Sequence, residues 1–318
     1  MINISSCDKV IVTGSIAYDD IMNFPGYFKD HFHPEKLHQI NISFVVDRLE
    51  KHLGGTATNI AFNITRVRKN KTHILGAMGK DHQALTDFFD EFGIDYSGSV
   101  IAKDLYTSTG KVMTDKSDNQ IWGYYYGAGA RGNEITFKKY AKNAFAIISA
   151  NHKQAFLHAQ NYCIENKVSY LYDPGMSLTW IDDVDLKKGV VSAAYVVGND
   201  YEIAQMERRL GKKMISVVQK DAGVITTLGA DGVQYEDSDT KISVSGYTVK
   251  NLIDPTGAGD AWRGGFVGAL LDGKELIKAL KIGNALASFA VESSGTANHR
   301  PTFDAIEKRA SKLRMSNE

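Results

Sequence analysis

The chain has 318 residues, enough for one large domain or two small ones. Its 37 Lys and Arg residues balance 37 Asp and Glu residues, so its charge gives no reason to expect binding to nucleic acid or to an anionic membrane. Two distant cysteines, Cys7 and Cys163, argue against a disulfide framework or a cysteine-rich zinc site. With no leader pattern at residues 1–9 and no apolar run of membrane-spanning length, we expect a cytoplasmic protein.

The first predicted element is a buried strand at Lys9–Thr13, which ends at Gly14. Asp19 and Asp20 follow, and we expect both in a loop at the carboxyl end of that strand, where α/β proteins bind ligands. One of these acids can accept hydrogen bonds from substrate hydroxyls. A solvated turn is the alternative interpretation.

Residues 24–53 do not have the pattern of a core. Apolar residues alternate with polar ones over 40–46, which predicts a two-faced strand in a flap over the site. His31, His33 and His38 are candidate metal ligands, although the proline between them interrupts any shared helical face.

A helix is predicted to start directly after Gly54 and Gly55, with its apolar side at positions 60, 61, 64 and 67. Two glycines at a helix start permit close approach of a ligand to the backbone. Asn59, in the first turn, offers a donor and an acceptor to a polyol. An ordinary helix start capped by a threonine is the alternative.

A strand at 73–75 and a helix at 82–92 come next, followed by a β-hairpin with arms at 108–114 and 120–126. The hairpin can pair with the strands of the flap. Its second arm ends in three tyrosines, among which Tyr125 is our candidate to stack on a planar base; a role in sheet packing is equally consistent with the pattern.

Two glycine-rich stretches fit nucleotide-binding patterns poorly. Residues 127–132 match GxGxxG, but they follow a hairpin and lack the acid expected about 20 residues later. Residues 268–275 nearly match a Walker A loop, but they lie at a helix end and Glu275 replaces the Ser or Thr. We therefore expect neither a dinucleotide fold nor a P-loop.

Strands at 145–149, 168–172, 193–197 and 222–227, with a helix at 153–165, predict a parallel sheet. Asn199 and Glu202 stand three apart at a helix start, so both can face a hydrated Mg²⁺. They also fit a capping box, and both readings can hold. A tight turn at 229–232 leads into a further strand at 233–236, and a helix is predicted at 276–291.

The stretch at 252–268 organises the chain. Gly257 and Gly259 stand at spacing two before Asp260, and a helical pattern follows. A glycine-rich loop that opens a helix makes an anion site, because free N–H groups and the helix dipole point at the ligand. With a carboxylate beside it, such a site suits phosphoryl transfer to a hydroxyl. An ordinary turn with an Asp near a helix start is the alternative.

Several motifs together resemble the PfkB family of ribokinase-like carbohydrate kinases. Residues 254–260, Asp-Pro-Thr-Gly-Ala-Gly-Asp, are similar to its C-terminal signature, and residues 54–59, Gly-Gly-Thr-Ala-Thr-Asn, to its N-terminal one. Residues 199–202, Asn-Asp-Tyr-Glu, match its NxxE motif, and residues 14–19 and 227–232 also fit. Within the family, residues 24–59 look most like the bacterial adenosine kinases of the ribokinase plan.

The resemblance implies an α/β fold: a ribokinase-like three-layer αβα sandwich with a mostly parallel central sheet and a small β-sheet lid. It implies one kinase domain over residues 1–318, with the lid formed by about 20–53 and 105–130. An exposed lid sheet also allows a homodimer through the lid.

Site residues are implied by position. Asp260 would be the base, and the amides of Gly257, Ala258, Gly259 and Asp260 would form the anion hole. The residues implied at the acceptor substrate are Ser15, Asp19, Ser43, Phe44, Gly55 and Asn59. The residues implied at the nucleotide are Asn199, Thr227, Gly229, Gly232 and Asn284. The residues implied at metal ions are Asn199 and Glu202 for Mg²⁺ through water, and Asp254 and Thr256, with the 293–296 loop, for K⁺.

The implied reaction is transfer of phosphate from ATP to the 5′-hydroxyl of a nucleoside. Adenosine is the first candidate substrate, with AMP as its product, as in purine salvage. Met176 and Ser177 stand where related adenosine kinases carry polar residues, often Gln. Inosine or guanosine, or a sugar such as ribose or fructose, are therefore alternative substrates. A non-catalytic nucleoside- or sugar-binding protein on this fold is the alternative from another class.

Overall fold

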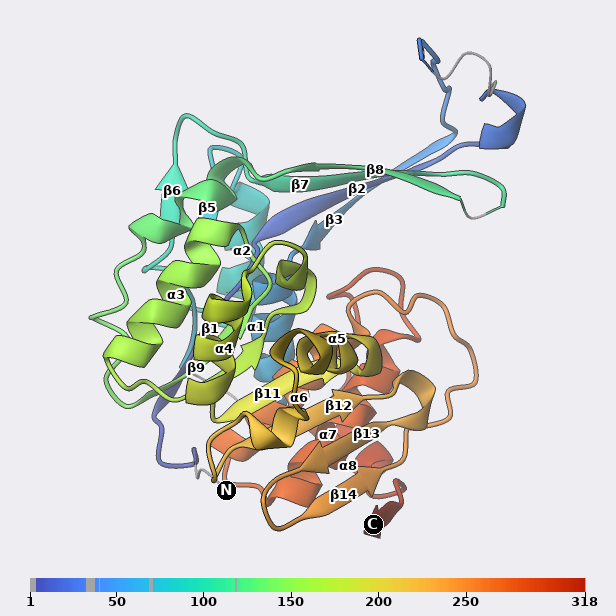
Figure 1. Cartoon of the computed structure of the whole chain (residues 1–318). Coiled ribbons are helices and arrows are strands. Elements are labelled where there is room, and N and C mark those ends of the chain that lie inside the picture. The colour runs from blue at the N-terminus through green and yellow to red at the C-terminus, as the bar shows by residue number, and fades with distance from the viewer. Residues whose placement is uncertain (1–3, 33–37, 40, 69–70, 118, 318) are drawn as a thin grey trace.

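The structure, a computed structural model, describes residues 4–32, 38–39, 41–68, 71–117 and 119–317 (Figure 1). Its main sheet has nine strands. From one edge to the other these are β15 (Met315–Asn317), β14 (Lys241–Val244), β13 (Val233–Glu236), β12 (Gly223–Thr227), β11 (Tyr195–Asn199), β10 (Tyr170–Asp173), β9 (Ala144–Ser149), β1 (Lys9–Thr13) and β4 (Thr72–Ile74). The strands from β12 to β4 pair in parallel, whereas β13, β14 and β15 are antiparallel.

Helices cover both faces of this sheet (Figure 1). One layer consists of α1 (Thr56–Val67), α2 (Gln83–Phe92), α6 (Ala258–Leu271), α7 (Leu276–Ala290) and α8 (Phe303–Ala310); the other consists of α3 (Lys153–Glu165), α4 (Asp183–Ser192) and α5 (Asp200–Leu210). Successive strand residues point to opposite faces, so Ile147 joins the core under α6 and α7 while Ile148 joins the core under α3 and α4. The predicted three-layer α/β sandwich is confirmed.

A second sheet of four strands projects from the edge of this body (Figure 1). Its order is β3 (Arg48–Gly54), β2 (Ala17–Asn23), β7 (Ser108–Thr114) and β8 (Gln120–Tyr125). The predicted hairpin is confirmed as the antiparallel pair of β7 and β8, and β7 pairs in parallel with β2. Two short strands, β5 (Ala77–Gly79) and β6 (Val100–Ala102), form a separate pair.

Two predictions for the segment after β1 were wrong. Asp19 and Asp20 lie inside strand β2 rather than in a loop, because β2 continues from the main body into the small sheet. Residues 41–46 form neither strand nor helix, and β3 starts only at Arg48. Phe44 in this segment instead packs against Phe24 and Phe28, so its apolar ring is covered by an aromatic cluster and does not need a paired strand.

The histidine prediction falls partly on His33, which lies outside the described residues. In the described part of the chain, no group of three or more His, Cys, Asp or Glu side chains could hold a metal ion. His31 instead packs edge-on against Phe24 and Phe44, at ring distances of 5.3 and 5.4 Å. It belongs to an aromatic cluster.

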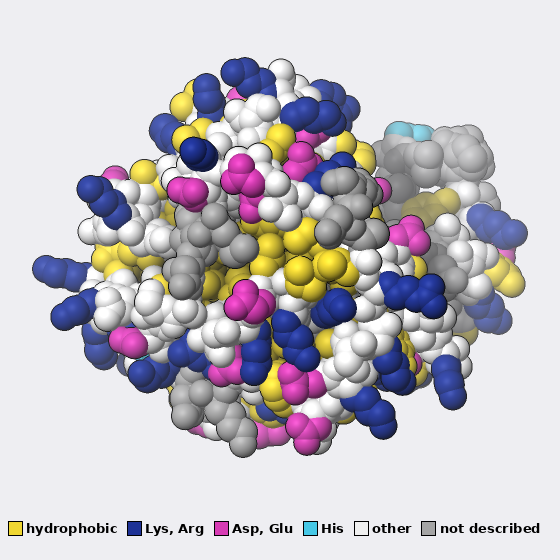
Figure 2. Space-filling model, turned by 90° about the horizontal axis from the view of Figure 1, so that it is seen from below, with side chains coloured by type: hydrophobic (Ala, Val, Ile, Leu, Met, Phe, Trp, Pro, Cys, Tyr) yellow, Lys and Arg dark blue, Asp and Glu magenta, His cyan; other side chains and the backbone are white. Residues whose placement is uncertain are grey.

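The glycine-rich stretch at 127–132 lies in a 3-10 segment, Gly127–Glu134, and α6 ends at Leu271 within the second glycine-rich stretch. Neither follows a strand and opens an α-helix, as the sequence indicated. No helix within the described ranges is long and apolar enough to cross a membrane. On the face shown in Figure 2, Lys and Arg side chains are interspersed with Asp and Glu, in keeping with the balanced composition.

Candidate active site

Glycines at the start of α6 allow other groups to come close to its backbone. Gly257 precedes the helix with φ of +79°, a left-handed conformation that favours glycine, and a side chain there would meet Thr296. Ala258, Gly259 and Asp260 form the first helical turn, so their N–H groups have no partners within the helix. A positive helix end with Asp260 in its first turn is what the sequence predicted.

The start of α1 lies beside the start of α6. Gly264 of α6 packs on α1, where a methyl group at 264 would lie 2.5 Å from the Cβ of Asn63. This close crossing brings Asn59 within reach of Asp260, and Asn59 Nδ2 donates a 2.8 Å hydrogen bond to Asp260 Oδ2. Asn59 is buried, and its Oδ1 has no partner in the described part of the chain. A buried acceptor without a partner is a candidate contact for a ligand hydroxyl.

The environment of Asp260 disfavours its charge. Burial raises the pKa of Asp260 to about 6, and the carboxylates of Asp173 and Asp19 act in the same direction. The Arg263 guanidinium and the hydrogen bond from Asn59 oppose this rise. The result is an acid that changes charge close to neutral pH, which is the range in which a general base works well.

Asp19 points to the same region from strand β2. Its carboxylate occupies space above two glycines of the neighbouring strands, Gly54 and Gly110, where a methyl at 110 would lie 2.9 Å from Asp19 Oδ1. Burial raises the pKa of Asp19, with His52 opposing and Asp20 contributing. Asp20, the next residue, turns to the opposite face and pairs with Lys111 at 2.7 Å.

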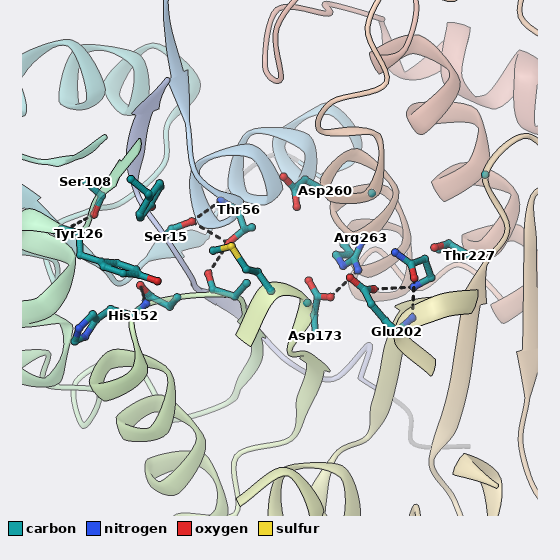
Figure 3. Close-up of a pocket in the computed structure, with 18 residues that line it drawn as sticks. Ser15, Thr56, Ser108, Tyr126, His152, Asp173, Glu202, Thr227, Asp260 and Arg263 are labelled. Carbon is teal, nitrogen blue, oxygen red and sulfur yellow. Dashed lines mark hydrogen bonds and ion pairs between the residues drawn. The ribbon is translucent and has the colours of Figure 1, made fainter. Parts of the chain in front are cut away.

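A cavity of about 520 Å³ joins these elements, a size within the range of small-molecule sites (Figure 3). Asp260, Gly259 and Arg263 of α6 line its middle, together with Ser15 and Thr56. Ser15 Oγ accepts a 3.0 Å hydrogen bond from the N–H of Thr56, which fixes the loop after β1 against the start of α1.

One end of the cavity is aromatic. Tyr126 lies edge-on to His152 and to Tyr124, at ring distances of 5.1 and 4.9 Å, and all three line the cavity with Ser108 and Met176. Burial lowers the pKa of His152, so its imidazole is neutral at pH 7. The prediction of Tyr125 is corrected: neighbouring residues of β8 face opposite sides, and Tyr124, not Tyr125, faces the cavity.

The opposite end is formed by the carboxyl ends of β11 and β12. Asn199, Glu202, Thr227 and Gly229 line it, and Figure 3 shows Glu202 and Thr227 at this end. Asn199 and Glu202 form the predicted capping box of α5: Asn199 Oδ1 accepts from the N–H of Glu202, and Glu202 Oε2 accepts from the N–H of Asn199, both at 2.8 Å. One carboxylate oxygen, Oε1 of Glu202, lies outside this pair of hydrogen bonds and within 4.0 Å of the place a methyl would take at Gly175.

Several predicted residues do not line the cavity. Asp19, Asn59, Gly257 and Ala258 lie next to its lining residues without being among them. Phe44 packs against Phe24 and Phe28 near the far end of the small sheet, and Ser43 precedes it there. Asn284 is buried, with its amide bonded to Trp262 Nε1 and to the carbonyls of residues 244 and 245. Gly232 packs against the backbone of residues 244–246, and Gly55, at φ +90°, against that of Ser15.

Asp254 and Thr256 lie in the loop before α6. Asp254 Oδ1 accepts from the N–H of Thr256 at 2.9 Å, and Oδ2 accepts from the N–H of Gly295 at 3.0 Å. The predicted cation residues therefore tie the 254–256 turn to the 293–296 loop. Neither lines the cavity.

Sequence reasoning missed an ion pair in the middle of the cavity. Arg263 Nη2 donates to Asp173 Oδ1 at 2.6 Å, and both side chains are almost fully buried. Arg263 stands one helical turn after Asp260, so i, i+3 spacing could have indicated that the two face one point. Asp173 ends strand β10, and no local signal relates it to a residue 90 positions later.

Comparisons with known proteins agree with this arrangement. Residues 15–302 match the model of the pfkB family carbohydrate kinases. The nucleoside kinase of Methanocaldococcus jannaschii is 27% identical over 310 residues, covering 97% of this chain and 98% of that protein. The structure of the Burkholderia thailandensis nucleoside kinase in complex with inosine is 27% identical, covers 95% of this chain and 97% of that one, and superposes with a TM-score of 0.82. The same enzyme in complex with ADP-inosine is 28% identical, covers 95% of each chain and gives a TM-score of 0.80.

Proposed function

The chain belongs to the pfkB family of carbohydrate kinases and is a kinase, and from this premise we propose that it transfers the γ-phosphoryl group of ATP to the 5′-hydroxyl of a nucleoside. One observation carries the proposal. The cavity has an acid at the start of α6 in its middle, an aromatic end, and an end at the carboxyl edge of the main sheet. We assign the aromatic end to the planar base of the nucleoside and the sheet end to ATP. The 5′-hydroxyl and the γ-phosphate then meet in the middle, beside Asp260.

Asp260 acts as the general base of this reaction. It takes the proton of the 5′-hydroxyl while the bond from O5′ to the γ-phosphorus forms and the bond from that phosphorus to the ADP oxygen breaks. The N–H groups at Gly257–Asp260 hold the oxygens of the moving group. Asp19 and the unpaired Oδ1 of Asn59 accept hydrogen bonds from ribose hydroxyls, with Ser15 nearby.

The nucleotide lies toward Asn199, Thr227 and Gly229, and the inosine and ADP-inosine complexes of a relative support this use of nucleoside and nucleotide. The free Glu202 oxygen fits Mg²⁺, which takes one or two carboxylates and completes its shell with water and phosphate. Bound there, Mg²⁺ would neutralise phosphate charge. We also propose a structural K⁺ near Asp254 and Thr256, where Asp254 joins the loop before α6 to the 293–296 loop.

The aromatic end supports a nucleoside over a sugar. Tyr124, Tyr126 and the neutral His152 offer ring faces and edges to a planar base, and a free sugar has no group to fill that end. We propose adenosine as the first substrate. Inosine and guanosine are the next candidates, because Met176 at this end is a soft thioether that does not select one edge of a base.

We further propose that residues 1–318 form one domain and that the small sheet serves as a lid, excluding water from the cavity and limiting hydrolysis of ATP. Its exposed edge strands allow the lid to pair in a homodimer. The proposals of a single domain and of a lid rest on Tyr124 and Tyr126. These side chains reach the cavity from the small sheet and from the residue that follows it.

An acceptor panel tests the function. ATP-coupled assays with adenosine, inosine, guanosine, ribose and fructose, in Mg²⁺ with and without K⁺, give kcat/KM for each. We expect the highest value for a nucleoside. A sugar kinase would instead prefer ribose or fructose, and a binding protein would show saturable binding with no phosphorylated product.

A further inference from the structure

Arg263 holds an unusual position for a structural arginine. Its side chain is 9% exposed and lines the cavity, between Asp173 on β10 and Asp260 one helical turn earlier (Figure 3). Burial alone would lower the pKa of Arg263, but the carboxylates of Asp173 and Asp260 raise it. The guanidinium therefore stays charged within the reaction site.

Only part of the guanidinium is used by the protein. Nη2 donates to Asp173 Oδ1 at 2.6 Å, while Nε has no hydrogen-bond partner among the described residues. A buried N–H without a partner is costly, so its presence beside a cavity points to a ligand that supplies the acceptor. A planar arginine can hold a carboxylate with one N–H and keep others for an oxyanion, which a lysine cannot do in the same geometry.

Gly259 provides an independent reason to place the guanidinium at the anion hole. Its backbone is not in the left-handed region, so conformation does not require a glycine there. A methyl group at 259, however, would lie 2.7 Å from Arg263 Nη1. Because Asp173 fixes the arginine, Nη1 stays against the first turn of α6, where the helix dipole and the N–H groups that follow Ala258 already favour an anion.

We propose that Arg263 is a catalytic residue: its guanidinium, aimed by Asp173, contacts the phosphoryl group during its transfer from ATP to the acceptor. The inference rests on the proposed function. Arg263 remains protonated throughout and gives only hydrogen bonds and charge, since the hydroxyl proton goes to Asp260. It offsets the negative charge of the moving group next to Asp260, as an arginine supplied in cis does in other phosphoryl-transfer enzymes.

The main test compares Arg263→Gln and Arg263→Lys with wild type in steady state. We expect kcat to fall about 100- to 1000-fold in both, as when a transition-state donor is removed, while KM for ATP and for the nucleoside changes less than about threefold. Arg131→Gln is the matched control, because Arg131 is a partly exposed arginine that pairs with Asp104. We expect wild-type kcat for the control.

A double variant separates catalysis from charge balance. Arg263→Gln alone leaves Asp173 buried without its partner and can unfold the chain. Asp173→Asn combined with Arg263→Gln removes both charges and keeps a hydrogen-bonding pair. A catalytic Arg263 predicts a low kcat in the folded double variant, whereas recovery of wild-type kcat would show that Arg263 only balances Asp173 and would overturn the inference.

A binding measurement supplies the second readout. With ADP, nucleoside and aluminium fluoride, a mimic of the transferring group, we expect wild type to retain ADP far longer than with ADP alone. The double variant should bind ADP normally and lose this retention. Equal retention in the two proteins contradicts the inference while leaving the proposed function intact; a wild type inactive on the whole acceptor panel overturns both.

Discussion

Asn59 and Asp260 lie 201 positions apart, and a 2.8 Å hydrogen bond from Asn59 Nδ2 to Asp260 Oδ2 joins the first turns of α1 and α6. The bond leaves Asn59 Oδ1 and Asp260 Oδ1 for a ligand. It also fixes the carboxylate whose charge governs the proposed reaction.

Asp260→Asn removes the proposed base while keeping a side chain of the same shape. We expect kcat to fall about 100- to 10,000-fold, the range for loss of a general base, with ATP affinity within about twofold of wild type. Steady-state assays and calorimetric titration with ATP measure the two quantities. Asp272→Asn, an exposed acid just past the end of α6, is the control and should be fully active. Near-normal turnover of Asp260→Asn would contradict the role of the base.

The pH dependence follows from the same residue. Because burial raises the pKa of Asp260 to about 6 and the base must be ionised, kcat/KM for the nucleoside should fall tenfold per pH unit below about pH 6. A profile from pH 5 to 8 checks this. The Asn59→Ala variant loses a hydrogen bond that lowers the pKa of Asp260, so its acid limb should move to higher pH. A limb near the usual pKa of aspartate, around pH 4, is incompatible with a buried base.

Variants of Tyr126 and Tyr125 test whether the base of the nucleoside binds at the aromatic end of the cavity. Tyr126→Leu should raise KM for adenosine about 5- to 100-fold, the cost of losing one aromatic contact to a base, with little change in kcat. Tyr125→Leu alters the opposite face of β8 and should leave KM unchanged. If the two variants behave alike, the base does not bind at this end of the cavity.

The sequence predicted the positions of the two helix starts well, because Gly257, Gly259, Asp260 and Asn59 are local signals of loops that open helices. It could not predict the Asp173–Arg263 pair, since contacts between distant elements arise only from packing. Strand alternation at 120–126 showed that neighbouring tyrosines face opposite sides, but which side meets the cavity depends on how β8 joins β7. Over 41–46 the same alternation was misleading, because Phe44 is covered by the aromatic rings of Phe24 and Phe28 without pairing to a strand.

The crossing of α1 and α6 is expected to set both stability and activity. Gly264→Ala places a methyl group 2.5 Å from Asn63 Cβ and 2.8 Å from the carbonyl oxygen of Ile60, so the helices must separate. We expect a loss of about 1–3 kcal/mol in the free energy of unfolding by urea, together with a lower kcat, because Asn59 and Asp260 ride on these helices. Gly123→Ala, where nothing lies within 4 Å of the added methyl, is the control. A Gly264→Ala variant with the stability of wild type would show that α1 and α6 are not closely packed at this position.

The proposed reaction is transfer of phosphate from ATP to the 5′-hydroxyl of a nucleoside. The most direct measurement incubates the wild-type protein with ATP and Mg²⁺ and either adenosine or 5′-deoxyadenosine, and follows the products by phosphorus NMR. We expect ADP and AMP in equal amounts from adenosine, and no nucleoside phosphate from 5′-deoxyadenosine, although that compound should inhibit competitively. Absence of AMP from adenosine, inosine and guanosine alike, or a phosphorylated product from 5′-deoxyadenosine, would contradict it.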